Sequence, residues 1–125
     1  MEKTVRETIK EIIRGHLKKN KGQVFGQCLT AVGWVGGTLP KLYEKDGMIE
    51  LPMSDVSNGG IVVGAGLMNK RPIYVIRYQG FNWYNCPMII NYACKSKELW
   101  KIPCPIFVRG IGMEGGIGPV AGSSH

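Results

Sequence analysis

The sequence has no closely spaced cysteine pair and no cysteine–histidine cluster with the spacing of a zinc module. Its four cysteines are Cys28, Cys86, Cys94 and Cys104, and none of them forms a CxxC motif. This pattern argues against a small disulfide scaffold and against a structural zinc site. We therefore expect free thiols, mostly buried, in a reducing compartment.

Long apolar runs are also missing. No stretch is long enough to span a bilayer, and Met1 leads directly into a charged segment without the apolar core of a signal peptide. We therefore expect a cytoplasmic protein without a membrane partner.

The familiar phosphate-binding motifs are absent although the chain contains 18 glycines. There is no GxxxxGK[ST] sequence, and no GxGxxG sequence follows a predicted strand in the required context. These absences argue against a nucleotide-phosphate site within this chain.

Acidic residues are scarce: the sequence has nine of them and 16 basic residues, which gives a net charge of +7. Such an excess raises the hypothesis of a basic module that binds nucleic acid or an acidic protein. Much of it is concentrated at one predicted helix end, in Lys18, Lys19 and Lys21, and no nucleic-acid motif accompanies it. We expect no nucleic-acid partner.

Apolar residues make up 44% of the 125 positions, which is enough for one core. No internal repeat or linker divides the chain, so residues 1–125 are expected to form a single domain. Helices are predicted at residues 4–17, 39–45, 57–69 and 83–100, and strands at 23–25, 48–51, 72–78 and 105–109. This alternation predicts an α/β fold with a mostly parallel sheet.

Three of these helices carry specific expectations. The first lies within residues 1–21 and places Val5, Ile9, Ile12, Ile13 and Leu17 on one face, whereas His16 is expected near the solvated side. Residues 57–69 contain four glycines, which are costly in an isolated helix. We therefore expect another element to pack very close to the backbone of this helix and stabilise it. In the helix over residues 83–100, Met88, Ile89, Tyr92 and Leu99 are expected to point inward.

Candidate site residues follow the predicted strands, because ligands of open parallel sheets bind outside the carboxyl ends of the strands. Asp55 ends the segment Leu51-Pro52-Met53-Ser54-Asp55, where helix capping by Ser54 or Asp55 is the simpler interpretation. Aromatic residues cluster after the third strand and serve either core packing or a pocket for a flat ring: Tyr78, Phe81, Trp83 and Tyr84. Residues 110–125 form a glycine-rich loop that ends at His125.

The ordered series of motifs resembles the amino-terminal half of the beta subunit of 2-oxo acid dehydrogenase decarboxylases, of the pyruvate and branched-chain type. The resemblance extends from about Gln23 to His125 and rests on these segments: Gln23-Val24-Phe25-Gly26-Gln27, Gly36-Gly37, Leu51-Pro52-Met53-Ser54-Asp55, Gly64-Ala65-Gly66 with Arg71-Pro72-Ile73, Tyr78 with Phe81, Asn91-Tyr92-Ala93-Cys94-Lys95, Pro105-Ile106-Phe107-Val108-Arg109-Gly110 and Ser124-His125. It implies a pyrimidine-binding domain of the transketolase-like superfamily, a three-layer sandwich with a parallel sheet between helices.

The resemblance also implies roles for four residues. Asp55 matches a family glutamate that hydrogen-bonds a ring nitrogen of the aminopyrimidine of thiamine diphosphate and favours its imino tautomer, although the aspartate is one methylene shorter. Tyr78 and Phe81 match aromatic positions at the pyrimidine ring, and His125 matches a histidine near the substrate. Gln27 stands where the family has an acidic residue after the glycine.

The same resemblance implies that the remaining contacts to the cofactor come from polypeptide outside this sequence. Family members hold the diphosphate and its Mg²⁺ through a Gly-Asp-Gly segment and an asparagine of an alpha-type subunit, and the beta subunit continues into a carboxyl-terminal domain. Neither feature occurs in this sequence. The expected partners are therefore an alpha-type subunit and a second such pair, in a dimer of heterodimers. Alternatively, the departures at Gln27 and Asp55 fit a non-catalytic scaffold or regulatory domain.

Overall fold

A computed structural model describes residues 2–77 and 82–111, without the side chains of residues 82–84. Along the chain the elements are α1 (Val5–Lys18), β1 (Gln23–Gly26), α2 (Ala31–Gly37), the 3-10 turn η1 (Glu44–Asp46), β2 (Met48–Glu50), α3 (Asp55–Leu67), β3 (Pro72–Ile76), α4 (Asn82–Met88), the π-helical turn η3 (Ile89–Ala93), α5 (Ser96–Trp100) and β4 (Phe107–Gly110).

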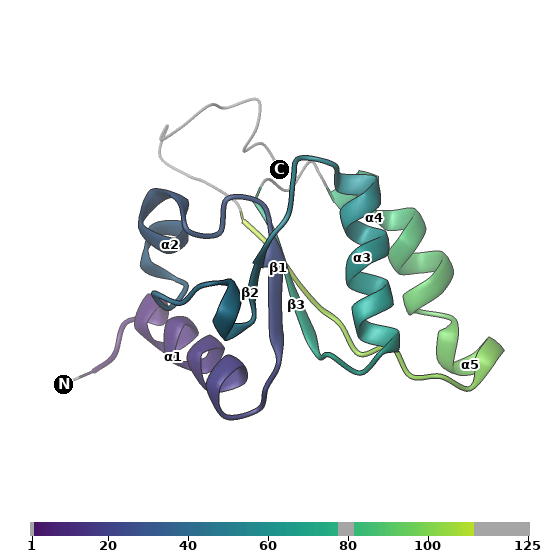
Figure 1. The fold of residues 1–125 in the computed structure, drawn as a ribbon, viewed down its shortest axis with the longest axis horizontal. Coiled ribbons are helices and arrows are strands. Elements are labelled where there is room, and N and C mark those ends of the chain that lie inside the picture. The colour runs from purple at the N-terminus through teal and green to yellow at the C-terminus, as the bar shows by residue number, and fades with distance from the viewer. Residues whose placement is uncertain (1, 78–81, 112–125) are drawn as a thin grey trace.

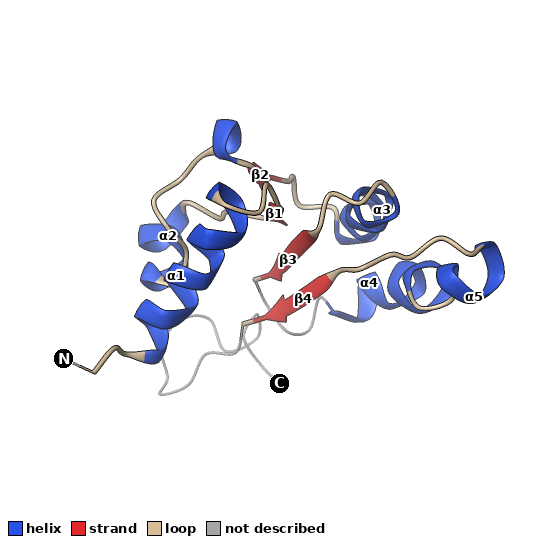
Figure 2. Cartoon of the chain, turned by 90° about the horizontal axis from the view of Figure 1, so that it is seen from below, coloured by secondary structure: helices blue, strands red, loops and turns tan. Residues whose placement is uncertain are grey.

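The four strands form one sheet in the order β2-β1-β3-β4, and every neighbouring pair is parallel. Helices α1 and α2 lie on one side of the sheet, and α3, α4 and α5 lie on the other (Figures 1 and 2). The predicted class, an α/β fold in which a parallel sheet lies between helices, is confirmed. All four strands point the same way, so their carboxyl ends meet at one edge.

Helix α1 begins as its sequence predicts. Thr4 caps it, because the backbone N–H of Glu7 donates to Thr4 Oγ1 and the Glu7 carboxylate accepts from the Thr4 backbone. Its predicted apolar face is only partly covered. Ile13 and Leu17 are buried, whereas Val5 is 77% exposed and Ile12 is 64% exposed.

The segment after β1 differs from the prediction. No helix spans residues 39–45, where only the short turn η1 forms. Instead α2 contains six consecutive residues with positive φ, from Val32 to Gly37, and three of them are not glycine. Left-handed backbone costs non-glycine residues about 1–2 kcal/mol each, so tertiary contacts have to hold this turn. Trp34 provides them: its Nε1 donates to the Leu42 carbonyl at 3.1 Å, and its ring meets that of Tyr43 edge-on.

The prediction that another element packs close to the backbone of α3 is confirmed, and the helix begins two residues earlier than predicted. A Cβ at Gly59 would lie 2.7 Å from Asn85 Oδ1 of α4. A Cβ at Gly66 would lie 2.7 Å from Cys104 Sγ and 2.8 Å from Ile106 Cγ2, both in the segment before β4. The two neighbouring segments therefore reach the backbone of α3 only because these positions lack side chains.

The single helix predicted over residues 83–100 is wrong. The chain forms α4, the π-helical turn η3 and then α5. Pro87 lies inside α4 and has no N–H to continue the hydrogen-bond ladder, and a π-helical turn is a common form of such an interruption. Two side chains expected to point inward are turned outward: Tyr92 is 44% exposed and Leu99 is 59% exposed.

The cysteines are free, but the expectation that they are mostly buried is wrong. Cys28 and Cys94 are exposed, and Cys86 and Cys104 are half-buried. Cys28 and Cys104 lie in loops and Cys94 follows η3, whereas Cys86 lies within α4. In the described part of the chain, no helix combines the length and apolar character that crossing a bilayer requires.

Candidate functional site

The site is built at the edge of the sheet where the parallel strands end, because ligands of such sheets bind outside the carboxyl ends. Gln27 directly follows β1, and Asp55 follows β2 after a short loop and opens α3. That loop is fixed from within α3, since the buried Asn58 donates from Nδ2 to the Pro52 carbonyl at 2.8 Å.

Asp55 and Gln27 come together although they are far apart in the sequence. Gln27 Nε2 donates to Asp55 Oδ1 at 3.1 Å, and Gln27 is buried. Within the described residues, the second carboxylate oxygen of Asp55 accepts no hydrogen bond. Asp55 is half-buried, so this oxygen is an acceptor held in place at the edge of the sheet.

The simpler interpretation, helix capping, holds only in part. Ser54 is the N-cap of α3 but makes no side-chain capping bond, and its Oγ bonds with Ser57 Oγ at 3.1 Å instead. Asp55 lies in the first turn, where a negative charge is favourable next to the helix dipole. The helix terminus therefore stabilises the charge of Asp55 while leaving its carboxylate directed at Gln27.

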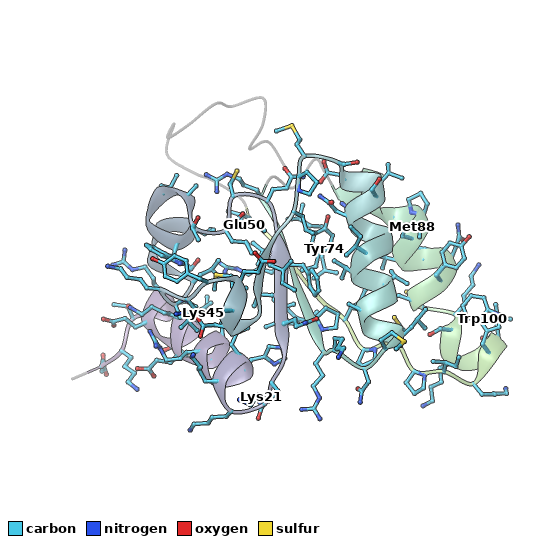
Figure 3. The ribbon with its side chains drawn as sticks, viewed as in Figure 1. Lys21, Lys45, Glu50, Tyr74, Met88 and Trp100 are labelled. Atoms are coloured by element: carbon cyan, nitrogen blue, oxygen red, sulfur yellow. The ribbon has the colours of Figure 1, made fainter. Side chains whose placement is uncertain are left out.

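Glu50 is a site residue that the sequence reasoning missed. Its carboxylate accepts hydrogen bonds from the backbone N–H groups of Leu29 and Thr30, both at 2.9 Å, and from Thr30 Oγ1 at 3.0 Å. Figure 3 shows Glu50 at the end of the sheet. This contact fixes the loop that follows Gln27. A carboxylate at the last residue of a strand was the available signal, but the pairing of Gly26 with Glu50 is what brings it to that loop.

Behind the edge, Tyr74 and Asn85 form a buried polar pair. Tyr74 Oη donates to Asn85 Oδ1 at 3.0 Å, and both residues are buried. Tyr74 lies between the sheet and α3 (Figure 3). Burial, with a contribution from the Asp55 charge, raises the pKa of Tyr74 to about 12. The neutral phenol is therefore the form that the folded protein favours.

Removing this hydroxyl should change both stability and its pH dependence. We expect Tyr74→Phe to lower the free energy of unfolding by about 1 kcal/mol at neutral pH, because one buried hydrogen bond is lost. The raised pKa adds stability that is fully present below pH 10 and is lost as the pH rises toward 12. The deficit of Tyr74→Phe should therefore shrink over that window in urea unfolding. Tyr43→Phe, at an exposed tyrosine, is the matched control, and a deficit independent of pH would contradict the assignment.

Three of the predicted site residues lie outside the described residues: Tyr78, Phe81 and His125. Their predicted positions at the site stay predictions. Asp55 is described and lies at the predicted edge of the sheet. His16 is not solvated as expected, because it is half-buried and its Nε2 donates to the Arg71 carbonyl at 2.7 Å. Across residues 2–77 and 82–111, no group of three or more histidine, cysteine or acidic side chains is arranged to hold a metal ion.

The fold and the residues at the carboxyl ends of the strands together define the class of protein. It is a parallel α/β domain in which a buried amide and a carboxylate face each other at those strand ends. One curated protein similar to it is the pyruvate dehydrogenase E1 component subunit beta of Mycoplasma pneumoniae, at 31% identity over 81 residues. The match covers 63% of this chain but only 24% of that protein. No protein-family model matches the chain. This weak similarity supports a relationship to the transketolase-like family and to a subunit related to thiamine-diphosphate enzymes.

Proposed function

We propose that this chain provides the pyrimidine-binding side of a thiamine-diphosphate site that a partner polypeptide completes. The observation that carries the proposal is Asp55, whose carboxylate is held at the carboxyl edge of the parallel sheet by Gln27. The similarity to a pyruvate dehydrogenase beta subunit supports the same assignment. The reaction class is decarboxylation of a 2-oxo acid or transfer of a two-carbon unit.

The residues present fit an aminopyrimidine ring. Asp55 Oδ1 is engaged by Gln27, so the second oxygen is available to accept a hydrogen bond from a ring nitrogen. The helix terminus keeps the carboxylate charge favourable. Tyr78 and Phe81 follow β3 in the sequence, and we propose that they stack on the ring at the carboxyl edge of the sheet.

In this proposal each group of the chain has a limited task. When bound, thiamine diphosphate supplies the electron sink for a carbanion. Asp55 orients the pyrimidine and holds its tautomer, and His125 takes part in proton transfer near the substrate. Mg²⁺ and the diphosphate are held by an alpha-type partner subunit, in a dimer of heterodimers. The chain's own role is thus to position one ring.

Titration calorimetry on the complex tests the proposal. The chain is co-expressed with a diphosphate-binding partner subunit, and thiamine diphosphate is titrated in the presence of Mg²⁺. We expect saturable binding with one site per pair of chains, weakened at least about tenfold by Asp55→Ala, because a charge-assisted hydrogen bond is lost. Glu44→Gln, in the exposed turn η1, is the control. A folded complex that binds no thiamine diphosphate would contradict the proposal.

A scaffold without catalysis is the second candidate. Its support is the aspartate at position 55 together with Gln27, whose amide already occupies one oxygen of that carboxylate. In a scaffold, the pair would serve to join the loop after β1 to α3. Asp55→Ala would then leave the activity of the reconstituted complex unchanged while lowering the stability of this chain.

A further inference from the structure

Residues 2–77 and 82–111 leave the sheet face next to α1 incompletely covered at its outer edge. A groove of about 570 Å³ opens there between α1 and the last two strands. Most of its lining is apolar, and its lining residues are Ile9, Ile12, Ile13, His16, Arg71, Pro72, Ile73, Pro105, Ile106, Phe107 and Arg109. It lies on the sheet face opposite α3, so it is separate from the proposed thiamine site.

The register of the sheet explains why the groove exists. Phe107 of β4 pairs with Ile73 of β3, so both side chains point to the face that α1 covers. Ile73 belongs to the core cluster beneath α1, whereas Phe107 is 63% exposed. In the part of the chain that the structure describes, β4 is the edge strand of the sheet, and α1 packs against β1 rather than over that edge (Figure 2). Parallel sheets are normally buried on both faces, so this position calls for a further covering element.

The helix beside the groove carries an apolar stripe of its own. Val5, Ile9, Ile12 and His16 follow one another at intervals of three and four residues and therefore lie on one side of α1. Val5 is 77% exposed and Ile12 is 64% exposed. An occupant of the groove has to cover this stripe as well as Phe107.

We propose that the occupant is α1 of a second copy of this chain, packed antiparallel across a two-fold axis near Ile9 and Ile12. In this arrangement the stripe of each copy fills the groove of the other, so both exposed surfaces are buried by one self-complementary contact. The two helix dipoles also oppose each other.

The charges at the two ends of α1 match this orientation. Glu2 lies before its first turn, whereas Lys19 caps its last turn. An antiparallel pair therefore places Glu2 of one copy beside Lys19 of the other, twice per dimer. Every charged or titratable residue that lines the groove is basic, namely His16, Arg71 and Arg109, and the amino-terminal end of the second α1 brings the Glu2 carboxylate toward them.

Sedimentation equilibrium of the purified chain, from low micromolar to several hundred micromolar, measures this association. We expect a dimer of twice the 13.8 kDa chain mass. Ile12→Glu should raise the dissociation constant at least about 100-fold, because the charge would be buried in an apolar contact. Ile61→Glu is the matched control, since Ile61 is an exposed isoleucine on α3 in the opposite layer. Circular dichroism verifies that both variants keep the fold.

Charge reversal tests the orientation. Glu2→Lys and Lys19→Glu should each weaken the dimer by about two- to tenfold, and the double variant should restore it. A chain that stays monomeric at every concentration overturns the proposal, as does an Ile12→Glu variant that behaves like Ile61→Glu. A monomer whose groove binds a helix of a different protein also overturns it. The measurement uses this chain alone, so its outcome is independent of thiamine binding.

Discussion

Replacing Asp55 with asparagine is expected to lower the kcat of the reconstituted complex by at least about 100-fold, the lower range for losing a group that controls proton transfer. Asparagine has nearly the same shape and can keep the contact with Gln27, which the aspartate makes at 3.1 Å. The variant therefore removes the charge and leaves the fold intact. Steady-state assays with a 2-oxo acid, together with urea unfolding of the variant, separate the two effects.

The companion variant Asp55→Glu tests the geometry. Glutamate brings the carboxylate about one methylene further toward the ring, and a misplacement of about 1 Å costs about 100-fold in rate. We therefore expect Asp55→Glu to exceed the wild-type activity. Glu44→Gln should leave the rate unchanged. Wild-type rates in Asp55→Asn would rule out a catalytic role for the carboxylate and favour the scaffold.

Gly59→Ala and Gly66→Ala are expected to leave the protein about 1–3 kcal/mol less stable than Gly64→Ala, because overpacking of a tight contact costs about that much. All three changes add one methyl group to α3 and gain the same helix propensity, about 1 kcal/mol. Only the surroundings differ. A Cβ at Gly59 or Gly66 would meet its nearest atom at 2.7 Å, whereas nothing lies within 4 Å of a Cβ at Gly64.

Urea unfolding of the three variants measures this difference. Gly64→Ala should be more stable than wild type, and the two others should be less stable than Gly64→Ala. Gly59→Ala should also disturb the hydrogen bond between Tyr74 and Asn85, because Asn85 Oδ1 is the atom that the new methyl group meets. Equal stabilities for all three would mean that α4 and the segment before β4 move away at little cost.

The alternation of predicted helices and strands along the chain was enough to predict the parallel fold, because each strand is a short apolar run next to a helix. It also placed Asp55 at the carboxyl edge, since that position depends only on the end of β2 and the start of α3. The close packing of α3 followed from its glycines alone. These features are local, or follow from the composition of a single element.

Other features depend on contacts that no local pattern encodes. The left-handed turn of α2 places Val32, Trp34 and Val35 in a conformation that their own propensities oppose. The contacts of Trp34 with Leu42 and Tyr43 outweigh that preference. The break at η3 was foreseeable in part, because Pro87 stands within the helical pattern.

The site was predicted only in part. Asp55 and Gln27 were each identified, but their hydrogen bond and the contacts of Glu50 were not predicted, because these contacts join segments that follow different strands. The register that pairs Gly26 with Glu50 sets these contacts, and side-chain type alone does not determine the register.

The strand order has a consequence for synthesis on the ribosome. The inner strand β1 emerges early, yet Val24 pairs with Met48 and Ile73, which are made later, and β4 follows later still. Until β3 has left the ribosome, one side of β1 has unpaired backbone groups, which are a template for pairing with other nascent chains. The growing polypeptide is therefore most exposed to misassembly over this interval, when binding by a chaperone would protect it most.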